Sequence, residues 1–246
     1  MIKIENTEVF GWEAAIRGMR NPMNSWDKSD SHPCWSCSGN IPSKCHLWGI
    51  NDLEHGYPCC KAPKYIIGEN DLKLMKSLSK AGSDHGKFLR MINVTCDIVA
   101  PLYWYKEFDT YKVGTVANSC STMHKIHAKE FTFDDFSCEH LIDEKGELRD
   151  WFCDIGYWSA KDVLHQTIMI LNFYRSKYIK TNDKKYWWQM IQLLPSSYNQ
   201  RRTVQMNYQV LKSMYHARKN HKLDCWIDFC RWAEGLPYFK EICMDG

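Results

Sequence analysis

The sequence predicts an α+β protein in which long helices accompany a smaller amount of strand, and three observations carry that prediction. After Ser159, apolar residues recur every three or four positions, which is the spacing of one buried helix face. The run from Lys87 to Cys96 (KFLRMINVTC) alternates in part and is rich in strand-forming residues. The stretch 24–65 is rich in Ser, Gly, Pro, Cys and Trp without any period, which indicates an irregular, Cys-rich insertion.

Length and composition indicate a single domain over 1–246 that carries this insertion. With 246 residues, of which 44% are hydrophobic and 25% charged, the chain can bury a substantial core. The aromatic share of 14% favours a large core or a broad subunit interface. A net charge of +3 is too small to indicate a nucleic-acid polymer as a partner.

The sequence also predicts a cytoplasmic protein without a membrane span. No stretch approaches the roughly 18 uninterrupted apolar residues that a membrane helix needs. The N-terminal MIKIENTEVFG lacks the layout of a signal peptide. In a reducing compartment, the seven cysteines scattered from Cys96 onward are expected to be buried, small apolar residues.

The first part of the chain is expected to hold two short helices. A helix over 7–20 would be capped by Thr7 and end before the Asn-Pro that follows it. A second helix over 71–81 would be capped by Asn70 and stopped by Gly82.

The strand over 87–96 is expected to lead into a helix over 97–108, with Asp97 as its N-cap. Thr132 has the look of a further helix start. Apolar stripes then predict four more helices, which begin at Ser159 or cover 184–193, 203–218 and 222–234.

The segment 97–127 (DIVAPLYWYKEFDTYKVGTVANSCSTMHKIH) concentrates more polar, ligand-capable side chains than any other part of the chain. After the aromatic helix it supplies hydroxyls, an amide, a lysine and one glycine. A nucleotide needs such groups, because phosphate requires cations and donors and a base edge requires amides or hydroxyls. The same composition also suits a loop whose Ser and Asn side chains close turns.

This segment resembles the flavin-dependent thymidylate synthases. In that family a helix carrying Arg-Gln-aromatic runs into Arg-His-Arg, and Ser-x-Asn-Glu-x-Ser-x-Arg follows. Here 106–108 (KEF) stands where the first motif is expected, and 111–113 (YKV) stands in place of the second. Further on, Asn118 and Ser121 match the family's Asn and second Ser, while Ser119 replaces its Glu.

The order of the family's landmarks continues in the C-terminal part. Residues 193–195 (LLP) and 203–207 (TVQMN) follow its Leu-Pro and Thr-x-Asn motifs, and Arg218 matches an Arg that holds the nucleotide. Gln209 and Ile191 stand where the family carries arginines. The similarity covers about 70–130 and 185–230, with order and spacing kept.

The resemblance implies an antiparallel sheet flanked by long helices, a homotetramer whose active sites use several subunits, and bound FAD. It assigns no catalytic side chain, because flavin hydride and a folate-borne carbon carry the family's chemistry. The nucleotide-binding residues that it implies are Glu107, Asn118, Ser119, Ser121 and Arg218. The cofactor-binding residues that it implies are His85, Lys112 and Asn207.

Loss of the family's arginines points to a changed substrate. Each charged contact to a phosphate contributes about 1.5–3 kcal/mol, so ordinary dUMP affinity would be lost unless other groups compensate. The chain is therefore expected to be a thymidylate synthase-like protein that modifies a pyrimidine nucleotide by one-carbon transfer or reduction, other than by standard dUMP methylation. The alternative is a non-catalytic relative that binds a nucleotide or a protein partner.

The Cys-rich insertion suggests a second kind of site. Cys34, Cys37, Cys45 and Cys59 offer a CxxC pair with two further thiolates, which suffices for a structural zinc ion. Reduced buried thiols or redox pairing are the alternatives, since Cys59 is followed directly by Cys60 and adjacent cysteines chelate poorly.

A Cys120–His124 pair, four residues apart, is a third option for nucleophilic chemistry. No orienting acid stands at a recognisable spacing, and a chance Cys near a His is the commoner explanation.

Overall fold

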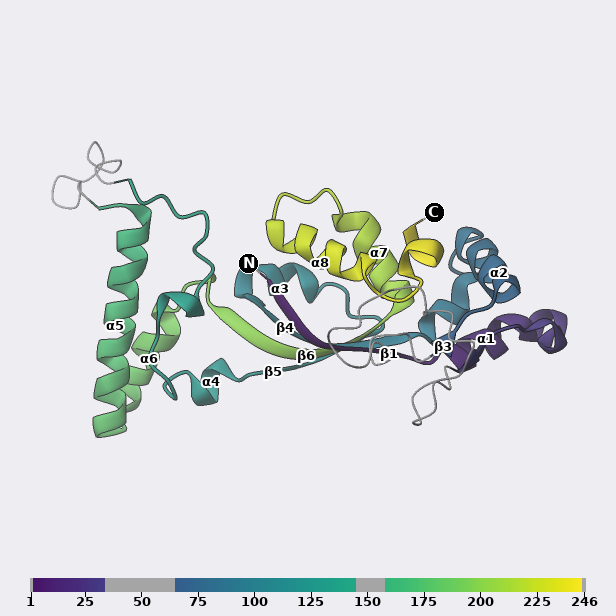
Figure 1. Ribbon diagram of the computed structural model, residues 1–246. Coiled ribbons are helices and arrows are strands. Elements are labelled where there is room, and N and C mark those ends of the chain that lie inside the picture. The colour runs from purple at the N-terminus through teal and green to yellow at the C-terminus, as the bar shows by residue number, and fades with distance from the viewer. Residues whose placement is uncertain (1, 34–64, 145–157, 245–246) are drawn as a thin grey trace, which may run out of the picture. The chain divides into compact units, whose positions relative to one another are not determined.

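The computed structural model describes residues 2–33, 65–144 and 158–244, and Figure 1 shows the elements that they form. The chain falls into two compact units. The first comprises Met1–Thr7, Thr95–Gln205 and His221–Phe229, and the second comprises Glu8–Val94, Met206–Asn220 and Cys230–Gly246. Of the insertion expected over 24–65, only the ends lie within the described residues.

Helices combine with an antiparallel sheet, as the resemblance implied. Four strands form this sheet in the order β1-β4-β6-β5. Their bounds are Lys3–Phe10 (β1), Asn93–Pro101 (β4), Asn199–Asn207 (β6) and Thr115–Ser119 (β5). Buried and half-exposed residues alternate along β4, because neighbouring side chains of a strand point to opposite faces.

The half-exposed face of β4 carries a polar cluster centred on Asp97. The Asp97 carboxylate accepts hydrogen bonds from Thr203 Oγ1 (2.6 Å), Arg201 Nη2 (2.7 Å) and Asn6 Nδ2 (2.8 Å). These three donors favour the charged carboxylate and hold the pKa of Asp97 far below its ordinary value.

The prediction of a helix over 7–20 is wrong for the first part of that range. Strand β1 continues through Thr7 to Phe10, and helix α1 covers only Trp12–Arg20. Between them Gly11 has φ +94, and a Cβ at this position would lie 2.1 Å from the Met91 carbonyl oxygen. The chain therefore turns from strand to helix at a residue that needs to be glycine.

The helix predicted over 97–108 is also too long, because β4 runs through Asp97 to Pro101 and α3 covers only Leu102–Phe108. Asp97 is thus a strand residue and not a helix cap. Proline disfavours helical angles in the residue before it, so the chain stays extended up to Pro101, which has ψ 150. The strand begins later than predicted as well, because Gly86–Arg90 form a short helix, η4, before it.

The predicted 203–218 helix divides in the same way. Val204 lies in β6, and helix α7 covers Tyr208–Arg218, capped by the Asn207 side chain, which accepts a hydrogen bond from Val210 N (2.9 Å). Exposed and buried residues alternate before Asn207, which is the pattern of a strand.

The remaining helix predictions are confirmed, with small shifts. Helix α2 begins two residues earlier than expected, at Glu69, and its N-cap is Gly68 rather than Asn70. Thr132 caps a short helix, as expected. Ser159 caps the longest helix with a capping box. The bounds are α2 (Glu69–Lys80), η5 (Phe133–Asp135), α5 (Ala160–Thr181), α6 (Lys184–Leu193) and α8 (Asp224–Glu234).

Two apolar clusters stabilise the first unit. Trp104 on α3 stacks on Phe108 (ring centroids 4.9 Å apart) and packs against Trp226 of α8 (4.8 Å). A separate cluster lies where α5 and α6 run side by side (Figure 1), and includes Leu164, Ile168 and Met190. Helix α4 (Thr122–Lys125) precedes Ile126 of the same cluster.

The second unit packs around Tyr208, which is fully buried. Its ring meets those of Trp12 (5.4 Å) and Phe239 (5.6 Å) edge to face, and its hydroxyl donates to the Pro237 carbonyl (2.7 Å). The C-terminal turn η6 (Lys240–Met244) is fixed to α2, because Ser79 Oγ donates to the Ile242 carbonyl (2.5 Å).

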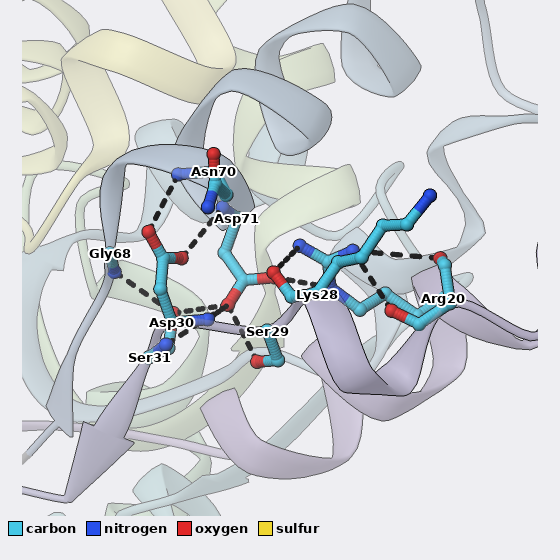
Figure 2. A network of polar contacts seen from close by, with 9 residues as sticks. Arg20, Lys28, Ser29, Asp30, Ser31, Gly68, Asn70 and Asp71 are labelled. Carbon is cyan, nitrogen blue, oxygen red and sulfur yellow. Dashed lines mark hydrogen bonds and ion pairs between the residues drawn. The ribbon is translucent and has the colours of Figure 1, made fainter.

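A buried polar network ties the N-terminal part of the second unit to α2 (Figure 2). The Asp71 carboxylate accepts hydrogen bonds from Arg20 Nε (2.6 Å), from Ser29 Oγ (2.7 Å), and from Ser31 Oγ (2.6 Å) and N (3.1 Å). Burial by itself would raise the pKa of Asp71, but the hydrogen bonds of Ser31, Ser29 and Arg20 outweigh it, and the net pKa is lowered. Asp71 therefore stays charged and holds the segment 29–31 in place.

Asp30 completes this network from the other side. Its carboxylate accepts hydrogen bonds from Asn70 N (2.9 Å) and Asp71 N (3.1 Å), so it satisfies backbone donors at the start of α2. Short strands extend the junction, since β2 (His32–Pro33) pairs antiparallel with β3 (Tyr65–Ile66). The two ends of the insertion are thus held next to each other.

No helix in the described ranges is long and apolar enough to cross a membrane.

Candidate functional site

The segment after α3 is exposed on the first unit, and its own aromatic side chains do not cover it. Lys112 is exposed, Val113 is 91% exposed, and Gly114 turns the chain with φ +83. Tyr111 is the ring that turns inward, with its centroid 6.1 Å from that of Trp226. The surface that the sequence singled out for ligand binding is therefore accessible.

Strand β5 continues this exposed segment. It is last in the strand order, and its residues from Val116 to Ser119 are all exposed. Asn118 and Ser119 are neighbours in a strand, so their side chains point to opposite faces. A ligand that contacts both has to lie at the outer edge of β5 rather than over one face.

Ser121 follows the strand as the N-cap of α4. Its hydroxyl accepts a hydrogen bond from His124 N (3.0 Å), which leaves the hydroxyl hydrogen to be donated elsewhere. Two hydrogen bonds hold the chain between β5 and α4 to β6. Cys120 N donates to the Arg201 carbonyl (2.9 Å), and Gln200 Nε2 donates to the Cys120 carbonyl (2.8 Å). Ser119 and Ser121 are thus presented from a fixed backbone.

Glu107 has an internal role in this structure. Its Oε2 accepts a hydrogen bond from the Trp226 indole nitrogen (2.8 Å) and lies 3.4 Å from His221 Nε2. His221 Nδ1 accepts a hydrogen bond from Leu223 N (3.1 Å), so the proton of the neutral ring sits on Nε2, facing Glu107. Glu107 therefore links the end of α3 to α8 at the inner side of the candidate segment.

Sequence reasoning missed Arg202 and Asp109, which support the same segment. The Arg202 guanidinium lies 3.8 Å from the Tyr105 ring centroid and donates from Nη1 to Asp109 Oδ1 (2.7 Å) and from Nε to Gln200 Oε1 (3.0 Å). Burial raises the pKa of Tyr105, whose hydroxyl donates to the Ile98 carbonyl (2.8 Å). Arg202 has no counterpart in a local sequence pattern, because two of its partners, Tyr105 and Asp109, lie in α3 and directly after it, far away in the sequence.

Other predicted binding residues lie in the second unit. His85 precedes η4 and is exposed, while Asn207 caps α7 and is half-buried. Their elements adjoin, since α7 packs on η4 and a Cβ on Gly86 would lie 3.7 Å from Gln209 Oε1. Arg218 is the last residue of α7 and is half-buried.

The chemistry of this pair fits a flavin cofactor. Asn207 uses its side-chain oxygen to cap α7, so its amide N–H groups remain as donors, and the His85 ring supplies another polar group from the adjoining element. Carbonyl and phosphate oxygens of FAD are acceptors that such donors can bind.

The cysteines of the described ranges are mostly inert. Burial raises the pKa of Cys96 and Cys243 to about 12 and that of Cys230 to about 11, and buried thiols of this kind do not react readily. Cys120 is exposed, as an unpaired thiol within the candidate segment.

The described residues hold no cluster of metal-binding side chains. Within 2–33, 65–144 and 158–244, no three His, Cys, Asp or Glu side chains are placed to hold a metal ion. Cys34, Cys37, Cys45 and Cys59 lie outside the described residues.

No family model matches the chain, and no curated protein matches it in sequence. Solved structures do match it over its whole length. The flavin-dependent thymidylate synthase ThyX from Helicobacter pylori, solved with FAD and dUMP, is 13% identical with a TM-score of 0.62, and covers 99% of this chain and 98% of its own. A second structure of that enzyme with FAD and dUMP gives 14% identity, a TM-score of 0.61, and coverage of 100% and 98%.

A related methylase matches as well. The UMP/dUMP methylase PolB from Streptomyces cacaoi, bound with 5-Br dUMP, is 12% identical with a TM-score of 0.54, and the match covers 98% of this chain and 94% of that one. At these identities the likeness establishes the fold. The resemblance noted in the sequence is thus confirmed at the level of the fold, and this chain is a divergent protein with the ThyX architecture.

Proposed function

We propose that this chain, which has the ThyX fold, is a flavin-dependent enzyme that modifies a pyrimidine nucleotide by one-carbon transfer or reduction. The observation that carries the proposal is the exposed, firmly supported segment from Lys112 to Ser121 in the place where the resemblance puts the nucleotide site. The ThyX and PolB structures that share the fold hold dUMP or 5-Br dUMP. A pyrimidine nucleotide is therefore the substrate class that we assign.

In this proposal Asn118, Ser119 and Ser121 bind the nucleotide from the edge of β5, and Arg218 serves its phosphate. Their amide and hydroxyl groups are neutral donors and acceptors, which suit a base edge and sugar hydroxyls. Glu107 acts on the nucleotide site indirectly, because its contacts to Trp226 and His221 hold the end of α3, where the segment begins, in position.

FAD is the cofactor that we propose, held by His85, Lys112 and Asn207. When bound, it supplies the hydride chemistry that no protein side chain can provide. The chain's own residues bind and orient the ligands, and hydrogen bonds from Arg202 to Asp109 and from Cys120 N to the Arg201 carbonyl hold the two ends of the segment to β6.

The substrate differs from ordinary dUMP in this proposal. With 111–113 (YKV) in place of Arg-His-Arg, the exposed segment offers one lysine where the family has three cationic or imidazole groups. A modified base or a different phosphate pattern is thus favoured. We also propose a single-domain, cytoplasmic homotetramer, as the resemblance implies.

The test is a flavin and turnover assay on the purified protein. The expected result is a flavin absorption band after incubation with FAD, and oxidation of reduced nicotinamide that depends on an added pyrimidine monophosphate. Asn118→Ala should weaken nucleotide binding by about tenfold or more, in line with the loss of one or more hydrogen bonds. Val163→Ala is the control, since Val163 is exposed on α5, outside the segment from Lys112 to Ser121. Absence of any flavin band would count against the enzyme.

A non-catalytic relative remains the second candidate, favoured by the changed cationic residues. Tight nucleotide binding without flavin and without turnover would identify it.

A structural zinc ion in the insertion is a separate proposal. Cys34, Cys37, Cys45 and Cys59 supply enough thiolates for one tetrahedral site.

A further inference from the structure

A cation that is fixed in place supports the candidate segment and lies outside every motif that carries the resemblance. Arg202 is in β6, between the Leu-Pro and the Thr-x-Asn motifs. Its Nε donates to Gln200 Oε1 (3.0 Å), and its Nη1 donates to Asp109 Oδ1 (2.7 Å). Its guanidinium also lies 3.8 Å from the Tyr105 ring centroid. These three contacts hold a planar charged group in one position and one orientation.

This guanidinium connects the two ends of the exposed segment. At one end, Asp109 directly follows α3. At the other end, the Gln200 side chain links Arg202 to the chain after β5, because its oxygen accepts from Arg202 Nε and its amide nitrogen donates to the Cys120 carbonyl (2.8 Å). Cys120 stands between the two serines that we assign to the nucleotide. One side chain therefore separates the cation from the backbone that presents both serines.

One nitrogen of this guanidinium remains for a ligand. Nε and Nη1 have their acceptors, whereas no acceptor within 2–33, 65–144 and 158–244 pairs with Nη2 of Arg202. The Arg202 side chain is only 14% exposed, yet Nη2 is not sealed from solvent. Nη2 thus offers two N–H donors and part of the positive charge at the surface.

We propose that Nη2 of Arg202 binds a phosphate oxygen of the pyrimidine nucleotide and replaces positive charge that the segment lacks relative to the family. The inference rests on the proposed function and adds a second cation to Arg218, which the resemblance assigns to the phosphate. Phosphate is bound well by a charged N–H donor that is held in position beforehand, because little ordering is then needed on binding. Asp109 opposes this binding, since its carboxylate lies 2.7 Å from Nη1 and offsets part of the positive charge.

The neighbouring Arg201 provides a matched control. It precedes Arg202 in β6, so its side chain points to the opposite face of the sheet. There its Nη2 donates to Asp97 Oδ2 (2.7 Å) and lies 3.8 Å from Glu5 Oε2. Replacing either arginine with Gln removes one positive charge from the same strand, but only Arg202→Gln removes it from the candidate segment.

Calorimetric titration of the full-length protein, with and without FAD, tests the proposal. UMP and dUMP are compared with uridine and deoxyuridine, so that the difference reports the phosphate. Arg202→Gln should weaken nucleotide binding by about 10- to 100-fold, the loss of one charged hydrogen bond, and should leave nucleoside binding within about threefold. Arg202→Lys keeps the charge but not the planar fork, so it should restore only part of the affinity. Arg201→Gln should leave the binding of all four compounds within about threefold of the parent value.

Asp109→Asn separates ligand binding from a purely structural role of the ion pair. If the pair only holds the segment in place, Asp109→Asn and Arg202→Gln both break it and should both weaken binding. If Arg202 binds phosphate, Asp109→Asn removes a repulsion and should tighten nucleotide binding by about threefold or more, while Arg202→Gln weakens it. Thermal unfolding shows which variants fold. Should Arg202→Gln not fold, Arg202→Lys and Asp109→Asn decide by the opposite signs of their effects.

The proposal is overturned if Arg202→Gln weakens nucleosides as much as nucleotides, or if Asp109→Asn and Arg202→Gln change nucleotide affinity in the same direction. In either case, nucleotide binding that Asn118→Ala weakens would leave the proposed function standing. If neither UMP nor dUMP binds, inorganic pyrophosphate is the second probe. A rise in Tm that Arg202→Gln abolishes and Arg201→Gln keeps would support the oxyanion site but refute the nucleotide as its ligand. No response to any probe would refute both.

Discussion

Replacing Asp71 with Asn should unfold the second unit at a much lower denaturant concentration. The carboxylate is fully buried and lies opposite Arg20, which is 4% exposed (Figure 2). Asn keeps the shape and one acceptor but removes the charge. It also turns an N–H₂ group toward donors such as Ser31 N (3.1 Å from Asp71 Oδ2).

The size of the effect follows from burial. Removing one partner of a buried ion pair leaves the other charge without compensation and costs about 3–5 kcal/mol. The exposed pair of Arg17 and Glu13, with both side chains 65% exposed, provides the control. Glu13→Gln should cost less than about 0.5 kcal/mol, because exposed pairs four apart on a helix are screened by water.

Urea denaturation and thermal unfolding, both followed by circular dichroism, measure the two variants against the parent protein. A loss of about 3 kcal/mol corresponds to a fall in Tm of roughly 6–12 °C for a chain of this size. If Asp71→Asn costs no more than Glu13→Gln, the network does not stabilise the fold and the reasoning fails.

Three further predictions test other parts of the account. Gly68→Ala should destabilise by about 2 kcal/mol or more, because its Cβ would lie 2.1 Å from Asp30 Cγ, whereas Gly82→Ala, with nothing within 4 Å, should show only backbone strain of about 1 kcal/mol. The stability that Asp97 contributes should be present above about pH 4 and be lost as pH falls toward its lowered folded pKa, so the difference in unfolding free energy between the parent protein and Asp97→Asn should shrink on acidification; a constant difference would contradict this. Purified protein should carry about one zinc ion by mass spectrometry, and the Cys34→Ser, Cys37→Ser double variant should lose it; a parent protein without zinc would end that proposal.

The long helices were predictable because each carries an apolar stripe, and α5 has in addition the capping side chain of Ser159. Ser159 and the stripe through Leu164 and Leu171 located the start of α5 to within a residue. The boundaries between strand and helix were not predictable from periodicity. Both β4 and β6 pass straight into a helix, and apolar residues of the strand continued the helical spacing by chance.

Strand β1 was missed for a different reason. Its residues show only weak alternation of burial, and they become a strand through pairing with β4, a partner about ninety residues away. Interactions at that separation leave no local pattern. The same holds for Arg202, whose partners Tyr105 and Asp109 precede it by more than ninety residues.

The polar composition after α3 singled out a segment that is mostly exposed in the structure, but it did not reveal the geometry of that segment. Only the structure shows that Glu107 bonds to Trp226, and that Asn118 and Ser119 point to opposite faces of β5. Those facts depend on tertiary contacts and on strand direction rather than on residue type.

The most direct test is to titrate the FAD-loaded protein with pyrimidine monophosphates while recording the flavin spectrum. If the edge of β5 forms part of a working site, one nucleotide will perturb the bound flavin, and Asn118→Ala will raise the concentration needed while Val163→Ala on α5 will not. A chain that takes up no flavin, or a flavin spectrum that no nucleotide alters, would contradict the account.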